Sequence, residues 1–194
     1  MELFHTWEPI IRKYASKPHT EIEIRFGKIN RNSFDTDVTK ETYEKILRRL
    51  RRYKEWESVS EYDTTVFYFQ NGGRVTYDNV LDQEIESVIK KPLEKCNFSL
   101  EKQPFDVRLG ISTETPFERD ENEQAVSSRS KKRMTFLRKN LKIDVTAVTG
   151  DPDDPDCESD TQYQVELEFV NVPDSRDELY NMVYKVFDVM KISS

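Results

Sequence analysis

The sequence is poor in the residues that build disulfide-linked folds and cysteine-based metal sites. Two cysteines, Cys96 and Cys157, occur in 194 residues. They stand too far apart for the short spacing of a cysteine metal site, and a single pair makes no disulfide framework. The scarcity of cysteine therefore excludes both arrangements, and we expect a reducing compartment.

Long hydrophobic runs are also missing. No apolar stretch approaches the roughly 20 residues that a membrane-spanning helix requires, and residues 1–18 lack the apolar region of a secretory signal. We therefore expect no membrane partner and predict a soluble intracellular protein. The length fits one domain over residues 1–194, because no internal repeat or linker is visible.

The chain lacks the basic excess that is typical of a simple nucleic-acid-binding protein. It has 37 acidic and 30 basic residues, and its formal net charge is −7. Charged residues make up 35% of the chain, compared with about 25% in an average protein. Any site for an anion must therefore be local, with its charge compensated elsewhere.

Three segments carry apolar residues at helical spacing. We predict a short helix over residues 4–14, a second helix over residues 39–56 and a third over residues 175–190. Ser175 and Glu178 form a capping box at the start of the third helix. Its apolar stripe is interpreted as core.

The second helix also carries a run of basic residues beside its apolar stripe. Such a run usually forms a solvated helix face, and this is how we interpret it. The residues concerned are Arg48, Arg49, Arg51, Arg52 and Lys54.

The remaining regular segments have the pattern of β-strands. The tripeptide Asn71-Gly72-Gly73 indicates a hairpin turn. Mostly short polar connections favour an antiparallel sheet that closes into a barrel or folds as a sandwich. Residues 150–160 are acidic, contain two prolines and are predicted to form a loop. The predicted strands are residues 21–26, 64–69, 74–77, 84–90, 105–113, 131–137, 141–148 and 163–170.

Four of these strands alternate charged residues on one face with apolar residues on the other. The charged faces could point into bulk water, as in an ordinary half-exposed sheet. Unlike charges are segregated by strand, however, which favours a shared polar interior in a barrel of about eight strands. The four faces are Glu21, Glu23 and Arg25; Arg129, Lys131, Arg133 and Thr135; Lys142, Asp144 and Thr146; and Gln164, Glu166 and Glu168.

Such an interior has a chemical consequence. Glutamates on neighbouring strands repel one another unless a cation lies between them, and their hard oxygens suit Mg²⁺ or Mn²⁺. Arginines and lysines in the same interior require an anion. A polyphosphate with a bound metal meets both conditions, and phosphoryl transfer needs little beyond positioning and charge stabilisation. Glu84 and Glu86 form a further pair, which we interpret as part of a solvated strand.

Five segments, in chain order, resemble the triphosphate tunnel metalloenzymes, and in particular their metal-dependent RNA triphosphatase branch. The likeness is closest to the N-terminal triphosphatase domains of giant-virus (mimivirus-like) mRNA capping enzymes. It implies an α+β fold, in which an antiparallel eight-stranded β-barrel forms a tunnel and helices pack on the outside. The segments are EIEIRFG from residue 21, GGRVTYD from residue 72, FDVRLGISTETP from residue 105, RSKKRMTFLRKNLKIDVTAV from residue 129 and YQVELEF from residue 163.

The resemblance also implies residue roles. Glu21, Glu23 and Glu168 would bind the Mg²⁺ or Mn²⁺ ion. Glu166 would order metal-bound water or join the coordination, and Glu114 would orient the attacking water as a general base. The groups expected to bind phosphate are Arg74, Lys90 (or its neighbour Lys91), Arg108, Arg129, Lys131 and Arg133. Asp144 would hold these basic neighbours, Lys142 stands where relatives often have arginine, and Gln164 stands where they often have glutamate.

The implied substrate is the 5′-triphosphate end of RNA, and NTPs are a second candidate. The chain would be a module of a longer capping enzyme, or act with a guanylyltransferase. If the source is viral, the place of action would be the host cytoplasm (a virus factory) or the virion. Two alternatives stay open: an inorganic tripolyphosphatase or other triphosphate hydrolase of the same superfamily, and a non-catalytic anion-binding barrel.

Overall fold

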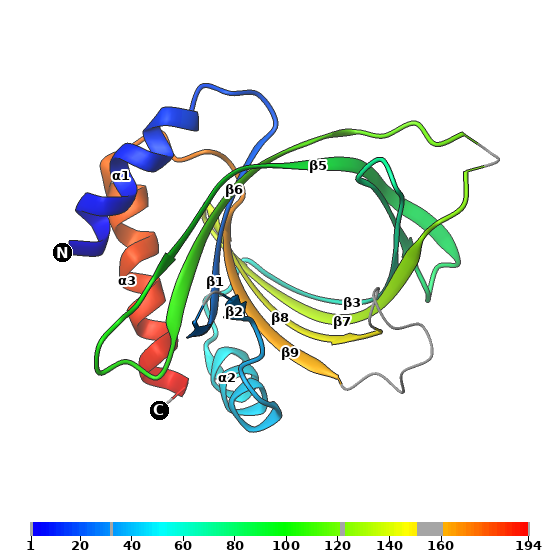
Figure 1. The fold of residues 1–194 in the computed structure, drawn as a ribbon. Helices are drawn as coiled ribbons and strands as arrows, with labels where there is room; N and C mark the ends of the chain where they lie inside the picture. Colours follow the sequence, from blue (N-terminus) through cyan, green and yellow to red (C-terminus); the bar gives the residue numbers. More distant parts are fainter. Residues whose placement is uncertain (1, 32, 121–122, 151–160, 194) are drawn as a thin grey trace.

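The computed structural model describes residues 2–31, 33–120, 123–150 and 161–193 (Figure 1). Apart from Gly150, the predicted acidic loop at residues 150–160 lies outside these ranges. No helix in the described ranges is both long enough and apolar enough to cross a membrane.

Eight antiparallel strands form a closed barrel, which confirms the predicted fold class. The sheet closes because β9 pairs with β1, with Glu23 opposite Glu168 and Arg25 opposite Glu166. A short strand, β2 (Ser33–Asp35), pairs with the end of β1 outside this ring. In order around the barrel, the strands are β1 (Thr20–Asn30), β6 (Asp106–Pro116), β5 (Gln83–Phe98), β4 (Gly73–Asp78), β3 (Ser58–Tyr68), β7 (Ser127–Arg138), β8 (Leu141–Thr149) and β9 (Gln162–Phe169).

Three helices cover one side of the barrel (Figure 1): α1 (Glu2–Tyr14), α2 (Lys40–Arg52) and α3 (Arg176–Ser193). All three helices were predicted. Thr39 caps α2 by accepting the backbone N–H of Thr42, and Ser175 accepts the N–H of Glu178 at the start of α3.

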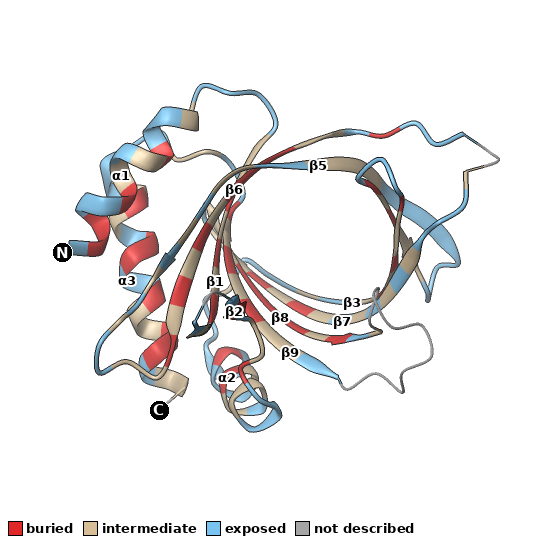
Figure 2. Ribbon diagram, in the orientation of Figure 1, coloured by how far each residue is buried: buried red, intermediate tan, exposed pale blue. Residues whose placement is uncertain are grey.

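The hydrophobic core lies between the helices and the outer face of the barrel. Trp7 of α1, Val186 of α3, Ile24 of β1 and Leu167 of β9 are completely buried there. Figure 2 shows buried residues gathered where β1, β6, β8 and β9 meet the helices. Since side chains alternate along a strand, burying the apolar face against the helices turns the charged face of these strands inward.

The predicted hairpin joins β3 to β4. Gly72 has a φ of +86°, a conformation that suits glycine, and the Asn71 side chain accepts the N–H of Gly73. A Cβ atom on Gly73 would lie 2.5 Å from the Phe117 ring. The turn therefore requires the glycines for two separate reasons.

Several element boundaries differ from the prediction. Helix α2 ends at Arg52, four residues before the predicted end, and Trp56 packs on Phe136 instead of continuing the helix. Strand β3 begins at Ser58, and β5 continues through Pro92 to Phe98. Pro92 is accommodated by a β-bulge between it and Glu94, so the proline does not end the strand.

Asp106 ties the end of the barrel near β2 together. Its two carboxylate oxygens accept the backbone N–H groups of Ile29 at 2.9 Å and Leu100 at 3.1 Å. Burial by itself would raise the pKa of Asp106. The two backbone N–H donors lower this pKa by a larger amount, so the net shift is downward.

We predict that Asp106→Ala destabilises the fold by about 1–2 kcal/mol, because two backbone donors lose their acceptor. Urea unfolding at neutral pH measures the loss. Asp106→Asn keeps one acceptor oxygen, so its free energy of unfolding should lie between those of the wild type and Asp106→Ala. Because the pKa of Asp106 is lowered in the fold, the wild-type advantage should disappear as the pH falls through that pKa. An equal advantage at acidic pH would contradict this assignment.

Candidate active site in the barrel interior

The barrel encloses a cavity of about 650 Å³, to which all eight strands contribute inward-facing side chains. These residues alternate with the outward residues that form the core, so one sequence pattern builds both surfaces. The cavity is unusual for a protein interior because most of the side chains that line it are charged or polar.

The cavity brings together all the predicted site residues except Arg108. Lys90 lines it, whereas Lys91 is exposed on the other face of β5, which decides between these two candidates for one position. The predicted residues that line the cavity are Glu21, Glu23, Arg74, Lys90, Glu114, Arg129, Lys131, Arg133, Lys142, Asp144, Glu166 and Glu168.

Arg108 lies beside the cavity but does not line it. It pairs with Arg25 in the β1–β6 register. Its Nε donates to Asn97 Oδ1 at 2.8 Å, and its guanidinium lies 4.5 Å from the centre of the Phe34 ring. Phe34 belongs to β2, a strand that the sequence analysis did not predict.

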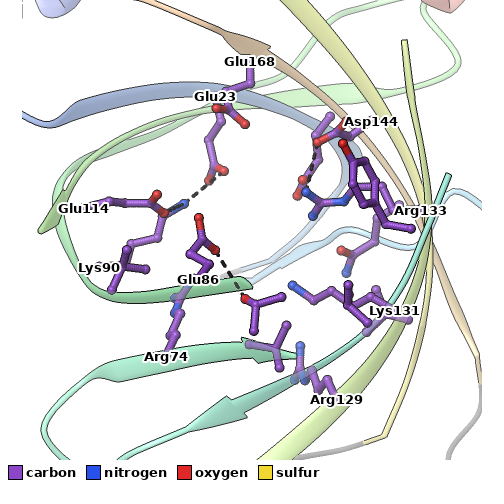
Figure 3. Close-up of a pocket in the computed structure, with 18 of the residues that line it drawn as sticks. Glu23, Arg74, Glu86, Lys90, Glu114, Arg129, Lys131, Arg133, Asp144 and Glu168 are labelled. Carbon is purple, nitrogen blue, oxygen red and sulfur yellow. Dashed lines mark hydrogen bonds and ion pairs between the residues drawn. The ribbon is translucent and has the colours of Figure 1, made fainter. Parts of the chain in front are cut away.

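Three carboxylates surround the ammonium group of Lys90 (Figure 3). Lys90 Nζ contacts Glu21 and lies 3.4 Å from both Glu23 Oε2 and Glu114 Oε1. Burial lowers the pKa of Lys90, but the carboxylates of Glu23 and Glu21 outweigh it and raise the pKa overall. The group is therefore a fully charged internal counter-ion.

Arg25 neutralises Glu23 and Glu166, on the same side of the cavity as Lys90. Its Nε lies 2.9 Å from Glu166 Oε1 and 3.1 Å from Glu23 Oε1 without a well-aligned hydrogen bond, and Nη2 donates to Glu23 Oε2 at 3.3 Å. The neighbouring Glu166 carboxylate is the main reason that the pKa of Arg25 is raised. Arg25 was placed on the charged face of its strand but not among the site residues. Because residues 21, 23 and 25 lie on one face of the strand, the inward position of Glu21 and Glu23 implies the same position for Arg25.

Strand β8 supplies two further pairs. Lys142 Nζ lies 2.8 Å from Glu168 Oε1. Burial nevertheless raises the pKa of Glu168 to about 7, although Lys142 opposes this shift. Asp144 is 2% exposed, accepts the Thr135 hydroxyl at 2.6 Å and lies 3.1 Å from Arg133 Nη1. Asp144 thereby fixes the direction of Arg133.

The opposite wall carries cations without carboxylate partners (Figure 3). Within the described residues, no ion pair involves Arg74, Arg129 or Lys131, and the buried Arg129 Nε has no hydrogen-bond partner. Burial, followed by repulsion from Arg133, lowers the pKa of Lys131 to about 8. The cavity therefore has a neutralised acidic wall and an uncompensated basic wall.

Glu86 adds a carboxylate to the cavity that the sequence analysis did not include among the site residues. It is exposed, as expected for a solvated strand, but it also lines the cavity and accepts the Thr76 hydroxyl at 3.3 Å. Glu84, its partner in the sequence motif, is exposed. A β-bulge between Thr76 and Tyr77 shifts the register of β4 against β5 at this point, and no sequence pattern indicated this shift.

The acidic wall has the donor chemistry for a divalent metal, although cationic side chains lie between its carboxylates. Among the described residues, no three acidic or histidine side chains form a ready-made metal site. The Lys90 ammonium nevertheless lies where Glu21, Glu23 and Glu114 converge. Hard carboxylate oxygens are the donors that Mg²⁺ and Mn²⁺ prefer. Glu21 and Glu23 lie in this cluster and Glu168 lies opposite Glu23 in the β1–β9 register, so the three expected ligands fit such a metal.

Comparison with known sequences identifies the family. A sequence profile described as "mRNA capping enzyme, beta chain" matches residues 69–182, more than half of the chain. The chain belongs to this family. The matched range includes Arg74 and the inward-facing strands β5 to β9.

Two fungal relatives carry the same description. The mRNA-capping enzyme subunit beta of Schizosaccharomyces pombe is 28% identical over 126 residues, which cover 64% of this chain and 41% of the relative. That of Yarrowia lipolytica is 24% identical over 121 residues, 61% of this chain and 31% of the relative. The chain thus spans less than half the length of these curated relatives.

Solved structures of two RNA triphosphatases share the fold. The Pct1 RNA triphosphatase of S. pombe superposes with a TM-score of 0.79 at 19% identity, covering 94% of this chain and 84% of that chain. The RNA triphosphatase domain of the mimivirus mRNA capping enzyme gives a TM-score of 0.66 at 16% identity, with 99% and 97% covered. At these identities, the likeness establishes the barrel fold.

We predict that Lys131→Met stabilises the protein at pH 7, because it removes a buried cation without an ion-pair partner. The gain should be on the order of a few kcal/mol. The pKa of Lys131 is about 8 in the fold, below its unfolded value of about 10.4. Wild-type stability should therefore rise between these two pH values, and the difference between the proteins should shrink.

Thermal melting at pH 7 and at pH 10 measures both effects. Lys132→Met is the matched control, since the Lys132 side chain on the same strand is 78% exposed. A destabilised Lys131→Met variant at pH 7 would contradict the description of the basic wall.

Proposed function

We propose that the chain is a metal-dependent RNA 5′-triphosphatase, which removes the γ-phosphate from triphosphate-ended RNA in the first step of mRNA capping. One observation carries the proposal: a single cavity holds a cluster of carboxylates facing cations that have no carboxylate partners. A triphosphate with a bound divalent metal complements both walls. Membership of the capping enzyme beta chain family supports RNA as the substrate.

Glu21, Glu23 and Glu168 would hold Mg²⁺ or Mn²⁺. When bound, the metal would supply charge stabilisation at the γ-phosphate and make a water molecule more acidic. The raised pKa of Glu168 is consistent with this role, since crowded buried carboxylates favour an added cation.

The residues of the basic wall would position the triphosphate. Arg74, Arg129 and Lys131 are free to donate to phosphate oxygens, because no carboxylate among the described residues occupies them. Arg133 keeps a fixed direction through Asp144 and presents a planar guanidinium. Interactions of this kind stabilise the charge that moves onto the leaving group in the transition state.

Glu114 and Glu166 would act beside the metal ligands. Glu114 lies 3.4 Å from Lys90, at the edge of the carboxylate cluster, and would orient the attacking water and accept its proton. Arg25, followed by Arg133 and Lys131, keeps the pKa of Glu166 low, at about 2, despite its burial, so this carboxylate stays ionised. An ionised Glu166 can accept hydrogen bonds from metal-bound water.

In this proposal the chain supplies one activity of a capping system. A guanylyltransferase, fused to the chain or acting with it, would use the diphosphate end that the reaction leaves. The site also suits NTPs and inorganic tripolyphosphate, because each presents the same three phosphates.

The direct test measures the release of radiolabelled γ-phosphate from triphosphate-ended RNA, with and without Mg²⁺ or Mn²⁺, beside ATP and tripolyphosphate. Metal-dependent release from RNA supports the proposal, and the three substrates rank its specificity. A preference for tripolyphosphate would favour the inorganic phosphatase alternative. No release by folded protein from any of them would reject an enzymatic function and favour an anion-binding barrel.

We expect Glu23→Gln to reduce metal-dependent turnover by at least about 100-fold, because a neutral amide is a poor metal ligand. Circular dichroism should show an intact fold. Glu84→Gln is the control, since Glu84 is exposed outside the cavity. Near wild-type turnover by folded Glu23→Gln would refute the metal assignment.

Arg133→Lys should lower kcat by about tenfold or more, corresponding to a loss of about 1.4 kcal/mol of transition-state stabilisation. Lysine keeps the positive charge but cannot reproduce the guanidinium fork. Steady-state kinetics at saturating metal measures the effect. If kcat is unchanged, Arg133 does not make bidentate contact with the reacting phosphate.

A further inference from the structure

A basic surface on helix α2 lies outside the barrel and takes no part in the proposed reaction. Five cations within seven residues are exposed, and none of them forms an ion pair within the described residues. Several other exposed cations do form ion pairs: Arg12 and Arg176 pair with Glu8, and Lys185 pairs with Asp188. The unpaired cations are Arg48, Arg49, Arg51, Arg52 and Lys54.

Four of these cations line a groove of about 470 Å³, which we call the α2 groove. Its lining is Arg48, Arg51, Arg52 and Lys54, together with Leu47 and Glu44. Arg48, Arg51 and Arg52 are spaced by three and four residues and share one helix face, where like charges repel. The helix dipole favours cations in the last turn, but Arg48 precedes that turn and Lys54 lies beyond the helix. An anion in the groove would remove the repulsion.

A short stretch of chain leads from the α2 groove to a residue that lines the barrel cavity. Strand β3 begins at Ser58, four residues after Lys54, and its residue Tyr62 lines the cavity while remaining 39% exposed. An exposed cavity residue marks an opening. Eight residues separate Lys54 from Tyr62, which limits their separation to no more than about 30 Å.

Aromatic side chains lie along the same stretch. Tyr53 is 40% exposed, packs against Trp56 with ring centres 5.1 Å apart, and lies 5.2 Å from the Arg138 guanidinium. Cations that follow a backbone, interleaved with exposed aromatic rings, are the features by which proteins bind single-stranded nucleic acid. Glu55, the neighbouring acid, is neutralised by Arg138 at 2.9 Å.

We propose that the α2 groove binds the phosphate backbone of the RNA chain whose 5′ end occupies the barrel. This inference rests on the proposed triphosphatase function. The groove would let the protein distinguish RNA from smaller triphosphates, which cannot reach it from the barrel. The groove contacts phosphates, so it adds affinity for a long substrate without reading its sequence. Chemistry inside the barrel does not depend on it.

The test compares wild type with the triple variant Arg48→Ala, Arg51→Ala and Arg52→Ala. The substrates are ATP and a triphosphate-ended single-stranded RNA of about 20 nucleotides, longer than the span of a typical single-stranded site. For RNA, KM should rise by about tenfold or more with kcat unchanged. For ATP, both constants should stay at wild-type values.

Salt dependence gives a second readout. Each neutralised phosphate contributes about 0.7 to the slope of log affinity against log salt for single strands, so removing three cations should reduce the slope by about 2. The matched control replaces three exposed lysines elsewhere, Lys17, Lys91 and Lys95, with alanine. It removes the same charge and should change neither KM nor the slope.

An RNA KM and salt slope equal to wild type in the α2 triple variant would overturn the inference and leave the groove available for an acidic protein partner. An equal rise in RNA KM and an equal loss of salt slope in the control variant would also overturn the inference, since they would show that the net charge of the protein, and not the α2 groove, determines RNA affinity. If wild type releases no phosphate from any substrate, the triphosphatase proposal fails. Fluorescence binding of the same RNA to both proteins then decides on the groove independently.

Discussion

The structure depends on the neutralisation of carboxylates inside the barrel. Glu21, Glu23 and Glu114 would repel one another strongly in a buried space, and the Lys90 ammonium holds them together. Arg25 does the same for Glu23 and Glu166. A barrel of this size could instead fill its interior with apolar side chains. Here the charged interior is maintained by internal ion pairs, which leaves the cations of the opposite wall uncompensated.

This arrangement is supported from outside the barrel. The alternation that points Glu23 inward also points Ile22 and Ile24 outward, where they are buried against the helix layer. A one-residue change of register would bury the glutamates under the helices and expose the isoleucines, so the core fixes which face is internal. The apolar packing therefore determines the positions of the site residues, although it forms no part of the site. A charged cavity of this kind is suited to an ion with both negative and positive parts, such as a metal-bound triphosphate.

Much of this organisation could be predicted from local patterns. The charged faces of β1, β7, β8 and β9 were visible because alternation is a property of each strand alone. Three features were not accessible in this way. The register shift between β4 and β5 beside Glu86 depends on the pairing of these strands, and the bulge at Pro92 depends on β6. The contact of Arg108 with Phe34 depends on β2, a three-residue strand without a recognisable pattern. Each depends on a neighbour that is distant in sequence.

The central claim is that Lys90 occupies a position built for a cation. Thermal melting of Lys90→Met with increasing Mn²⁺ tests it most directly, with Lys91→Met on the exposed face of β5 as the control. Without metal, Lys90→Met should melt below wild type, because its carboxylates lose their counter-ion. Mn²⁺ should raise its melting temperature by more than that of wild type or of Lys91→Met, since ligand binding stabilises the folded state. A Mn²⁺ response in Lys90→Met no larger than that of wild type would contradict the account.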